Sequence, residues 1–200
     1  MPDWFIKGGV VMWPLLVCSV AAVAIIIERM WALQRKRIIA GELVAEIQRQ
    51  PRPPDLTETV RTLTQQDATV LGELARTALS HAWLTKSENV EAVQAMARQQ
   101  MAKLERGLTT LALVVELGPL LGLLGAVSGM VRVFGDVAKH GIRDPQLISG
   151  GISEALIATF TGLAISIPAL VAYMYLRRRI DILALEVERH VDELLKHLYH

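Results

Sequence analysis

The stretch that decides the fold of this chain is GPLLGLLGAVSGMVRVF, residues 118–134. Its glycines are Gly118, Gly122, Gly125 and Gly129, and their spacing places them on one face of an α-helix. Most of the residues between them are large and apolar. In a bilayer, where lipid tails and side chains are equally apolar, close approach of backbones through small residues drives helix association. The stretch therefore predicts a transmembrane helix that packs closely against another helix.

A second stripe of small residues has the same helical spacing in a later apolar stretch. Its members are Ala155, Thr159, Gly162, Ser166 and Ala169. We expect the stripes to pack against each other, against neighbouring subunits or against the helices of a partner. Thr159 and Ser166 would place hydroxyl groups in this otherwise apolar contact. Ordinary packing of small residues explains the spacing equally well, so the stripes alone assign no function.

The composition is typical of a membrane protein with charged extensions. Of the 200 residues 52% are hydrophobic, and 21 basic residues nearly balance 20 acidic ones. The single cysteine, Cys18, excludes an internal disulfide, and we expect no metal and no other cofactor. The arginines at 177–179 directly follow an apolar run, which favours a topology anchor over a nucleic-acid site. No nucleophile, base and orienting group occur at a recognisable spacing, so we do not expect an enzyme.

Three apolar runs predict an all-α membrane protein with three transmembrane helices and long cytoplasmic helical extensions. Basic residues follow the first and third runs, which places those ends in the cytoplasm and the N-terminus on the outer side. The expected segments are the outer N-terminal end with the first transmembrane helix (1–29), a cytoplasmic helical section (30–107), the second transmembrane helix (108–135), an outer loop (136–150), the third transmembrane helix (151–176) and a cytoplasmic C-terminal helix (177–200).

Helix signals lie both inside and outside the spans. Thr85 and Glu88 fit a capping box that begins a cytoplasmic helix. We expect this helix to continue without interruption into the second span, because its apolar face persists up to that span. Pro119 lies inside the second span and Pro168 inside the third, where neighbouring helices can satisfy the freed carbonyl groups. Pro168 should kink the third span.

Two ionisable residues mark the ends of the second span. Glu116 should lie near its cytoplasmic edge and Arg132 near its outer edge, because charges at the centre of a bilayer are costly. Asp136 follows Arg132 by four residues, and an ion pair along the helix would account for both. Glu116 lies about opposite the glycines. Pairing with the first or third span is one interpretation of Glu116, and an ion exit is the other.

Blocks of sequence in each span carry a resemblance to a known family. They are GGVVM, PLL and IIER (8–12, 14–16 and 26–29), PLLGLLG and GM (119–125 and 129–130), and GISEALIAT, GL and IPA (151–159, 162–163 and 167–169). Together they resemble the MotA/TolQ/ExbB proton-channel family, specifically its ExbB/TolQ branch. The shortness of the cytoplasmic section argues against a flagellar-type stator, which resembles the family but has an extra pair of spans.

The resemblance implies an assembly and a function. The chain would form a homo-oligomeric ring, a pentamer, in the bacterial inner membrane, with the outer side being the periplasm. The ring would surround the helices of a dimeric, single-span ExbD/TolR-like partner, which carries the essential aspartate. Protons flowing between ring and partner would then drive work on a periplasmic or outer-membrane system, through a TonB- or TolA-like protein, in transport or envelope maintenance. The alternative is a non-conducting structural scaffold of the same fold.

The resemblance also implies an ion route. Thr159 matches the pore-facing threonine of the third span, and Glu154 matches the family's glutamate near its outer end. Ala126 departs from the pattern, because the family commonly has threonine there. This departure puts a two-threonine route and the choice between proton and sodium in doubt. We expect Thr159 to be the main polar group of the route, facing Ala126, with Glu154 and Ser166 as further candidates. A hydroxyl bonded to its own helix, four residues back, is the competing interpretation of Thr159.

Overall fold

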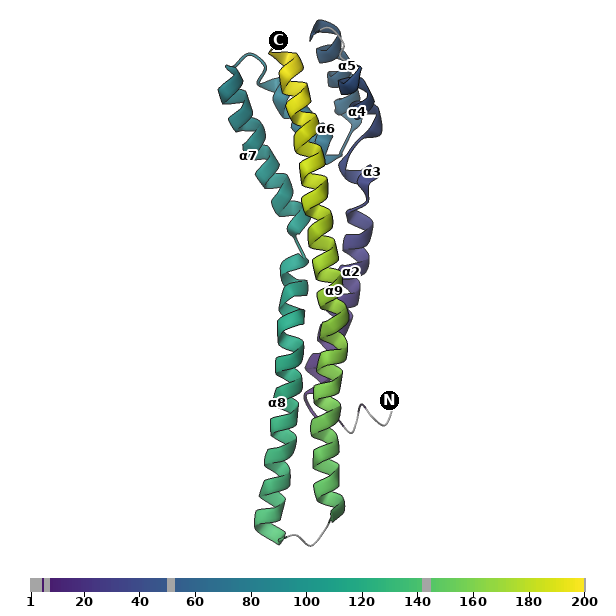
Figure 1. Cartoon of the computed structure of the whole chain (residues 1–200), viewed down its shortest axis with the longest axis vertical. Helices are drawn as coiled ribbons and strands as arrows, with labels where there is room; N and C mark the ends of the chain where they lie inside the picture. The colour runs from purple at the N-terminus through teal and green to yellow at the C-terminus, as the bar shows by residue number, and fades with distance from the viewer. Residues whose placement is uncertain (1–4, 6–7, 50–52, 142–144, 200) are drawn as a thin grey trace. The chain divides into compact units, whose positions relative to one another are not determined.

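The computed structural model describes residues 5, 8–49, 53–141 and 145–199, and no strand occurs among them (Figure 1). The helices are α2 (Met12–Ala32), α3 (Arg35–Ile38), α4 (Gly41–Gln48), α5 (Pro53–Gln66), α6 (Val70–Ser80), α7 (Lys86–Glu105), α8 (Leu108–His140) and α9 (Pro145–Leu198). The predicted all-α fold is confirmed. Met1 and His200, predicted to lie on opposite sides of the membrane, lie outside the described residues.

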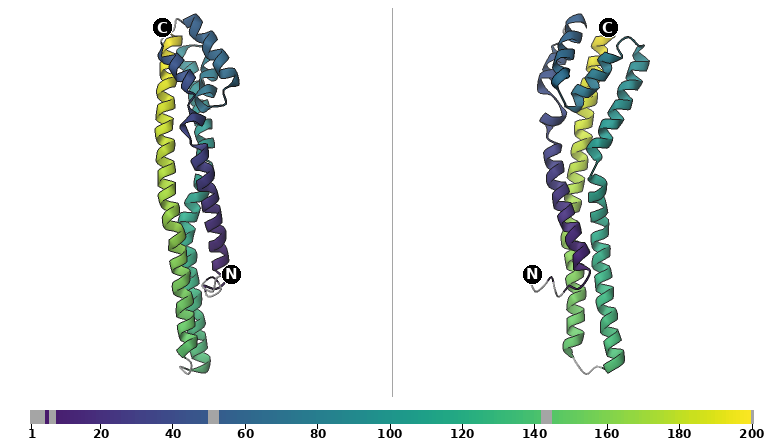
Figure 2. Two further views of the ribbon diagram at one scale, coloured as in Figure 1. Left: turned by 90° about the vertical axis from the view of Figure 1, so that its right-hand side faces the viewer. Right: turned by 180° about the vertical axis from the view of Figure 1, so that it is seen from behind.

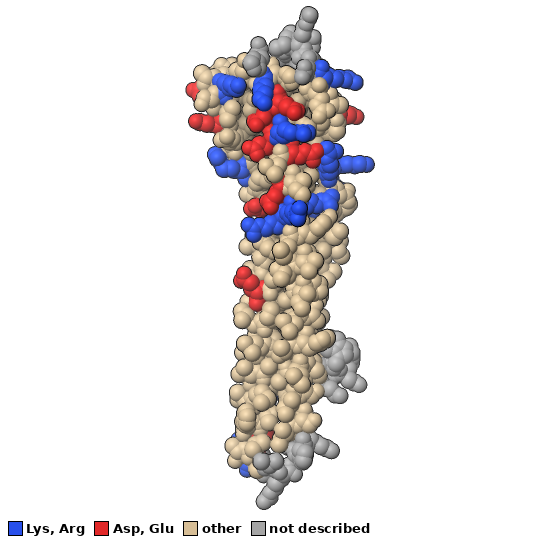
Figure 3. Space-filling view, viewed as in Figure 1, with Lys and Arg blue, Asp and Glu red and all other residues tan. Residues whose placement is uncertain are grey.

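The chain divides into two compact units. Unit 1 consists of Met1–Glu28 with Gly107–Tyr175, and unit 2 consists of Arg29–Arg106 with Leu176–His200. On the face shown in Figure 3 most of the charged side chains lie over unit 2, whereas unit 1 presents few charges. This division follows the sequence, because the long apolar runs belong to unit 1.

Three helices are long and apolar enough to cross a bilayer. The qualifying segments are Met12–Ala32, Leu108–Lys139 and Ile148–Leu198. Large apolar side chains point outward along them, and Val17, Leu120 and Phe160 are 67%, 60% and 74% exposed. In water such a surface would be an aggregation hazard, whereas hydrocarbon solvates it. The predicted multi-pass membrane fold with three spans is therefore confirmed.

We expected the cytoplasmic helix to run into the second span without interruption, and this prediction is wrong. α7 ends at Glu105, and Gly107 adopts a left-handed conformation with φ 90° before α8 begins. Only glycine adopts such a φ at little cost. The Arg29 guanidinium donates to the carbonyl oxygens of Lys103 and Leu104, at 3.5 and 3.4 Å. These carbonyls lie in the last turn of α7, where they have no partner within the helix. The helical spacing of apolar residues continues across Gly107, so the sequence gives no sign of the break.

The connection between the second and third spans is shorter than the predicted loop, 136–150. α8 continues to His140 and α9 begins at Pro145, so the expected loop is helical at both ends. Gly141, with φ 72°, ends α8, and its N–H donates to the carbonyl of Val137 at 2.8 Å. The third span and the C-terminal helix are one helix of 54 residues, which continues through Pro168.

Unit 2 combines α3–α7 with the C-terminal part of α9. Its most deeply buried side chains include Leu33, Ile38, Leu43, Ile47, Leu71, Leu74 and Leu194. The predicted capping box at Thr85 and Glu88 is confirmed at the start of α7. The fully buried Asn89 donates to the carbonyl of Ala78 and to the hydroxyl of Tyr199, both at 2.9 Å, which ties α6, α7 and the end of α9 together.

Candidate proton route along α8 and α9

The spans α8 and α9 lie side by side in unit 1, as all three ribbon views show (Figures 1 and 2). A Cβ atom added to Gly122 would lie 3.0 Å from the carbonyl oxygen of Ala158 and 3.1 Å from Cα of Thr159. One added to Gly129 would lie 3.0 Å from the carbonyl oxygen of Gly151. The two backbones therefore touch directly, and side chains at these glycines would separate them.

The other predicted packing residues belong to the same contact. Gly118 lies against Ser166 and Gly162, and a Cβ on Gly162 would come within 3.1 Å of Cα of Gly122. A Cβ on Gly125 would come within 2.5 Å of Cβ of Ala158. Of the three arrangements expected from the sequence, the structure shows the first, in which the two stripes pack against each other within one chain. Sequence spacing identifies a bare helix face but not the helix that fills it.

Both predicted prolines lie inside these helices. Pro119 is half-buried on α8, and Pro168 is exposed on α9.

The hydroxyl of Thr159 lies on the seam between the two helices. Its Oγ1 donates to the carbonyl oxygen of Ala155, at 3.0 Å on its own helix, and lies 3.4 Å from the carbonyl oxygen of Gly122 on α8. The bond to its own helix is the competing interpretation raised from the sequence. Donation leaves the oxygen's lone pairs available to accept a hydrogen bond, and the half-buried side chain is open to an incoming group.

Ser166 places a second hydroxyl in the seam, seven residues further along α9. The side chain is 5% exposed and faces Gly118, and its Oγ has no hydrogen-bond partner in the described part of the chain. A buried hydroxyl without a partner costs about 1–3 kcal/mol. Ser166 therefore retains both a donor and acceptor capacity inside the membrane-spanning unit.

Arg132 pairs with Glu154 across the two helices, whereas the sequence had suggested a pair with Asp136 on its own helix. The Glu154 side chain is 16% exposed and the Arg132 side chain 55%. Gly9, with φ 74°, brings its backbone against the same carboxylate, and a Cβ there would collide with it. Sequence reasoning missed Gly9, although the pair of glycines before the first apolar run was visible.

Glu116 takes no part in these hydrogen bonds and ion pairs, as far as the described residues show. Glu116 is exposed on α8, and it forms no hydrogen bond or ion pair with another described residue. The predicted pairing of Glu116 with the first or third span is therefore absent from the described part of the chain. Ala126 is half-buried, one turn along α8 from Gly122, whose carbonyl oxygen is near Thr159.

The groups that can handle protons form a row along one helix. Glu154, Thr159 and Ser166 span about 18 Å of α9, out of roughly 30 Å of hydrocarbon. All three contact α8 residues or face them. Within the described residues, no cluster of three or more His, Cys, Asp or Glu side chains is arranged to hold a metal ion. The arrangement offers hydrogen-bonding groups at intervals in a spanning unit.

Comparisons with known proteins agree with this picture. Residues 66–189 match the MotA/TolQ/ExbB proton channel family. An ExbB-like biopolymer transport protein of Synechocystis sp. is 31% identical over 182 residues, covering 87% of this chain and 69% of the relative. Biopolymer transport protein exbB1 of Vibrio cholerae is 30% identical over 165 residues, covering 80% and 72%. Biopolymer transport protein ExbB of Helicobacter pylori is 42% identical over 81 residues, covering 40% and 56%.

Proposed function

The chain belongs to the MotA/TolQ/ExbB proton channel family, in its ExbB branch, and on that premise we propose that it is the ring-forming subunit of a proton-driven motor. The observation that carries the proposal is the family match over residues 66–189, which includes α8 and all three groups of the row, Glu154, Thr159 and Ser166. The complex converts the proton motive force into work in biopolymer transport or envelope maintenance.

A single-span partner of the ExbD/TolR type supplies the titrating carboxyl group in this proposal. In hydrocarbon a carboxyl group that exchanges a proton needs a polar neighbour, since lipid offers none. Thr159 can accept a hydrogen bond from that group or from a water, because its own proton is directed at the carbonyl oxygen of Ala155. One charge crossing 100 mV releases about 2.3 kcal/mol, enough to reorient a loosely held helix.

The exposed face of α8 supports assembly with further helices. Leu120, Leu123 and Val127 are 60%, 57% and 51% exposed, and their helical spacing puts them on the same face as Glu116. In the proposed complex this face meets neighbouring copies or the partner, so Glu116 finds its partner between chains or marks the ion exit. A pentameric ring around a partner dimer, with a TonB- or TolA-like protein beyond it, is the arrangement we propose.

The complex resides in the bacterial inner membrane, with the N-terminus in the periplasm and the C-terminus in the cytoplasm. Basic residues at 35–37 and 177–179 follow the first and third apolar segments and support this orientation.

A non-conducting scaffold of the same fold is the second candidate. Two observations favour it: Ala126 lacks the hydroxyl that the family commonly has, and the Thr159 hydroxyl already bonds its own helix. Both candidates predict a ring, so the shape of the complex does not separate them, whereas proton flux does.

The deciding experiment is proton uptake into liposomes that contain the purified chain with its single-span partner. We expect uptake driven by an imposed potential that requires both proteins and that stops when the partner's intramembrane aspartate is changed to asparagine. Native mass spectrometry of the same sample gives the subunit ratio. An intact complex without uptake would favour the scaffold, and failure of the two proteins to form a complex would overturn the motor.

A further inference from the structure

Unit 2 has a groove between α7 and the C-terminal part of α9, and no residue of the proton route lines it. Its volume is about 430 Å³. The floor is apolar and includes Val93 of α7 with Val187 and Val191 of α9, each at most 5% exposed. The charged side chains along the rim decide which kind of surface can cover this floor.

The rim of the groove is acidic. Glu105 of α7 and Glu188 and Asp192 of α9 contribute three carboxylates, against the one guanidinium of Arg98. All four side chains are exposed, and none of the three carboxylates forms an ion pair with a described residue. A surface that covers this acidic groove must bring positive charge, because like charges across an interface oppose association.

The same unit carries a basic edge, which consists of Trp31, Arg35, Lys36 and Arg37, all of them exposed. The Arg37 guanidinium carbon lies 3.8 Å from the centroid of the Trp31 ring. Arg35 pairs with Glu186, whereas Lys36 and Arg37 form no ion pair with a described residue. The basic edge therefore presents positive charge beside a large aromatic ring, the two features that are enriched where proteins bind each other.

Two nearby residues of α9 fix the relative positions of the basic edge and the acidic groove. Glu186 contacts Arg35 of the edge, whereas Glu188 lines the groove. Side chains two residues apart on a helix point about 200° apart and lie about 3 Å apart along its axis. The two surfaces therefore lie on opposite sides of α9 at the same level, as α3 and α7 do in the ribbon views (Figures 1 and 2).

We propose that the acidic groove binds the basic edge of a second copy of this chain. The edge of a chain cannot reach its own groove, because the two lie on opposite sides of α9. A contact between one surface of a copy and a different surface of the next is head-to-tail, and such contacts close into a ring when the rotation between copies fits. The proposal rests on the ring of the proposed function and adds to it a charged contact between the unit 2 parts of neighbouring subunits.

The two surfaces divide the work of this contact. Lys36 and Arg37 of one copy meet the carboxylates of the next copy's rim, which fixes the register of the two chains. Trp31 of the same edge covers the apolar floor of the groove and supplies the apolar burial.

Charge reversal tests the proposal on the full-length protein purified in mild detergent. Glu188→Lys with Asp192→Lys reverses the groove, and Lys36→Glu with Arg37→Glu reverses the edge. We expect either reversal to raise the protein concentration needed for assembly about tenfold or more, as measured by native mass spectrometry of a dilution series. All four substitutions in one chain should restore assembly, because every groove then faces the opposite charge again.

The matched control is Glu58→Lys with Glu91→Lys. It makes the same change of net charge as the groove reversal, at two exposed carboxylates of unit 2 that do not line the groove. We expect this control to assemble like the wild type. Wild-type assembly by either reversal overturns the proposal, and so does failure of the fourfold variant to regain assembly.

A disulfide crosslink keeps the proposal testable if a reversed protein fails to fold. In a protein with Cys18→Ser, Arg37→Cys and Glu188→Cys have α9 between them, so they cannot form a disulfide within one chain, which requires Cα atoms within about 7 Å. Oxidation in membranes should therefore produce covalent dimers and larger oligomers. Glu58→Cys with Glu188→Cys is the control and should remain monomeric on a non-reducing gel.

The crosslink also separates this proposal from the proposed function. Absence of covalent oligomers in the Arg37→Cys, Glu188→Cys protein, when native mass spectrometry still shows an oligomer, overturns the contact and leaves the motor standing. A protein that forms no oligomer in either measurement overturns both the contact and the ring.

Discussion

The guanidinium of Arg132 on α8 pairs with the carboxylate of Glu154 on α9, and the backbone of Gly9 closes over the same carboxylate. The pair joins three parts of unit 1 that are far apart in the sequence. Glu154 is also one of the three α9 groups of the proposed route, so the contact connects the fold to that route.

The burial of the pair is asymmetric, which gives a first prediction. Arg132→Gln leaves a carboxylate that is only 16% exposed without its partner, whereas Glu154→Gln leaves a guanidinium that can reach water. We expect Arg132→Gln to be more destabilising, by about 1–3 kcal/mol. Thermal unfolding of the purified protein in detergent measures this, with the exposed Lys139→Gln as the control. Equal losses of stability in Arg132→Gln and Glu154→Gln would contradict the asymmetric burial of the pair.

The contact of glycines between α8 and α9 gives the second prediction. A Cβ atom at Gly122 would lie 3.0–3.1 Å from backbone atoms of α9. The α9 backbone cannot move away without separating the two helices. Gly122→Leu should cost at least about 1–3 kcal/mol of stability, the usual cost of overpacking. Gly135→Leu is the matched control, because a Cβ at Gly135 meets no atom within 4 Å. The same unfolding assay decides, and a stable Gly122→Leu protein would contradict the packing described.

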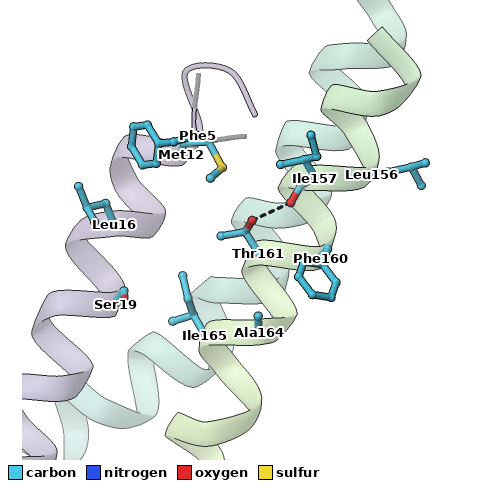
Figure 4. A pocket seen from close by; sticks show the side chains of 10 residues that line it. All are labelled: Phe5, Met12, Leu16, Ser19, Leu156, Ile157, Phe160, Thr161, Ala164 and Ile165. Carbon is cyan, nitrogen blue, oxygen red and sulfur yellow. Dashed lines mark hydrogen bonds between the residues drawn. The ribbon is translucent and has the colours of Figure 1, made fainter. Parts of the chain in front are cut away.

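The Thr159 hydroxyl is the subject of the third prediction, which rests on the proposed function. Thr159→Val keeps the shape of the side chain and removes the hydroxyl. We expect an assembled complex whose proton uptake falls at least about tenfold. Thr161→Val is the control, since the Thr161 hydroxyl makes the same kind of bond to its own helix, at 2.8 Å to the carbonyl oxygen of Ile157, but lines a pocket between α9 and α2 (Figure 4). Ala126→Thr, which restores the common residue of the family, should be tolerated.

Wild-type uptake by Thr159→Val would end the assignment of this hydroxyl to the route. It would shift attention to Glu154 and Ser166, the other members of the row on α9. A loss of uptake by both threonine variants would instead indicate a general requirement for these hydroxyls in helix structure.

The capping box of α7 predicts a dependence of stability on pH. The side-chain hydroxyl of Thr85 donates to Glu88 at 2.7 Å and its backbone N–H at 3.0 Å, and these bonds hold the pKa of the Glu88 carboxyl below its ordinary value of 4.5. The folded state therefore binds this proton less readily than the unfolded chain. The stabilisation is complete above the ordinary pKa and is lost as the pH falls through the lowered one.

Glu88→Gln should flatten the acid side of the stability profile. We expect the unfolding temperature of the wild type to fall on acidification below about pH 4.5, and that of Glu88→Gln to fall less. Glu91→Gln, on an exposed part of the same helix, should follow the wild type. Calorimetry across this pH range makes the comparison, and parallel curves for all three proteins would contradict the prediction.

The proposed orientation gives the last prediction. In a protein with Cys18→Ser, Lys139→Cys at the end of α8 should react with a membrane-impermeant thiol reagent added to the periplasmic face, and Glu91→Cys should not. Both positions are exposed in the structure, so burial does not explain a difference. Labelling of Glu91→Cys in intact cells would reverse the topology.

Local signals in the sequence were sufficient for much of this fold. The three spans follow from the length and hydropathy of the apolar runs, because a bilayer of fixed thickness requires helices of a fixed minimum length. The capping box at Thr85 was also predictable, since its two hydrogen bonds depend on residues only three apart. The break at Gly107 was not, because a single left-handed residue leaves the apolar period unchanged.

The partners of the functional side chains were decided by the tertiary structure. From the sequence Arg132 had a candidate partner four residues away, but the rotation and register of α8 against α9 brought Glu154 to it instead. That register depends on which glycines of α8 contact which backbone atoms of α9. These residues are more than 30 positions apart in the sequence, as Gly122 and Thr159 are. The sequence alone determined which helix faces are bare and which side chains can carry a proton. Only the packing of α8 on α9 decided which of these groups meet, because side-chain contacts between helices depend on their relative rotation and not on the period of either helix.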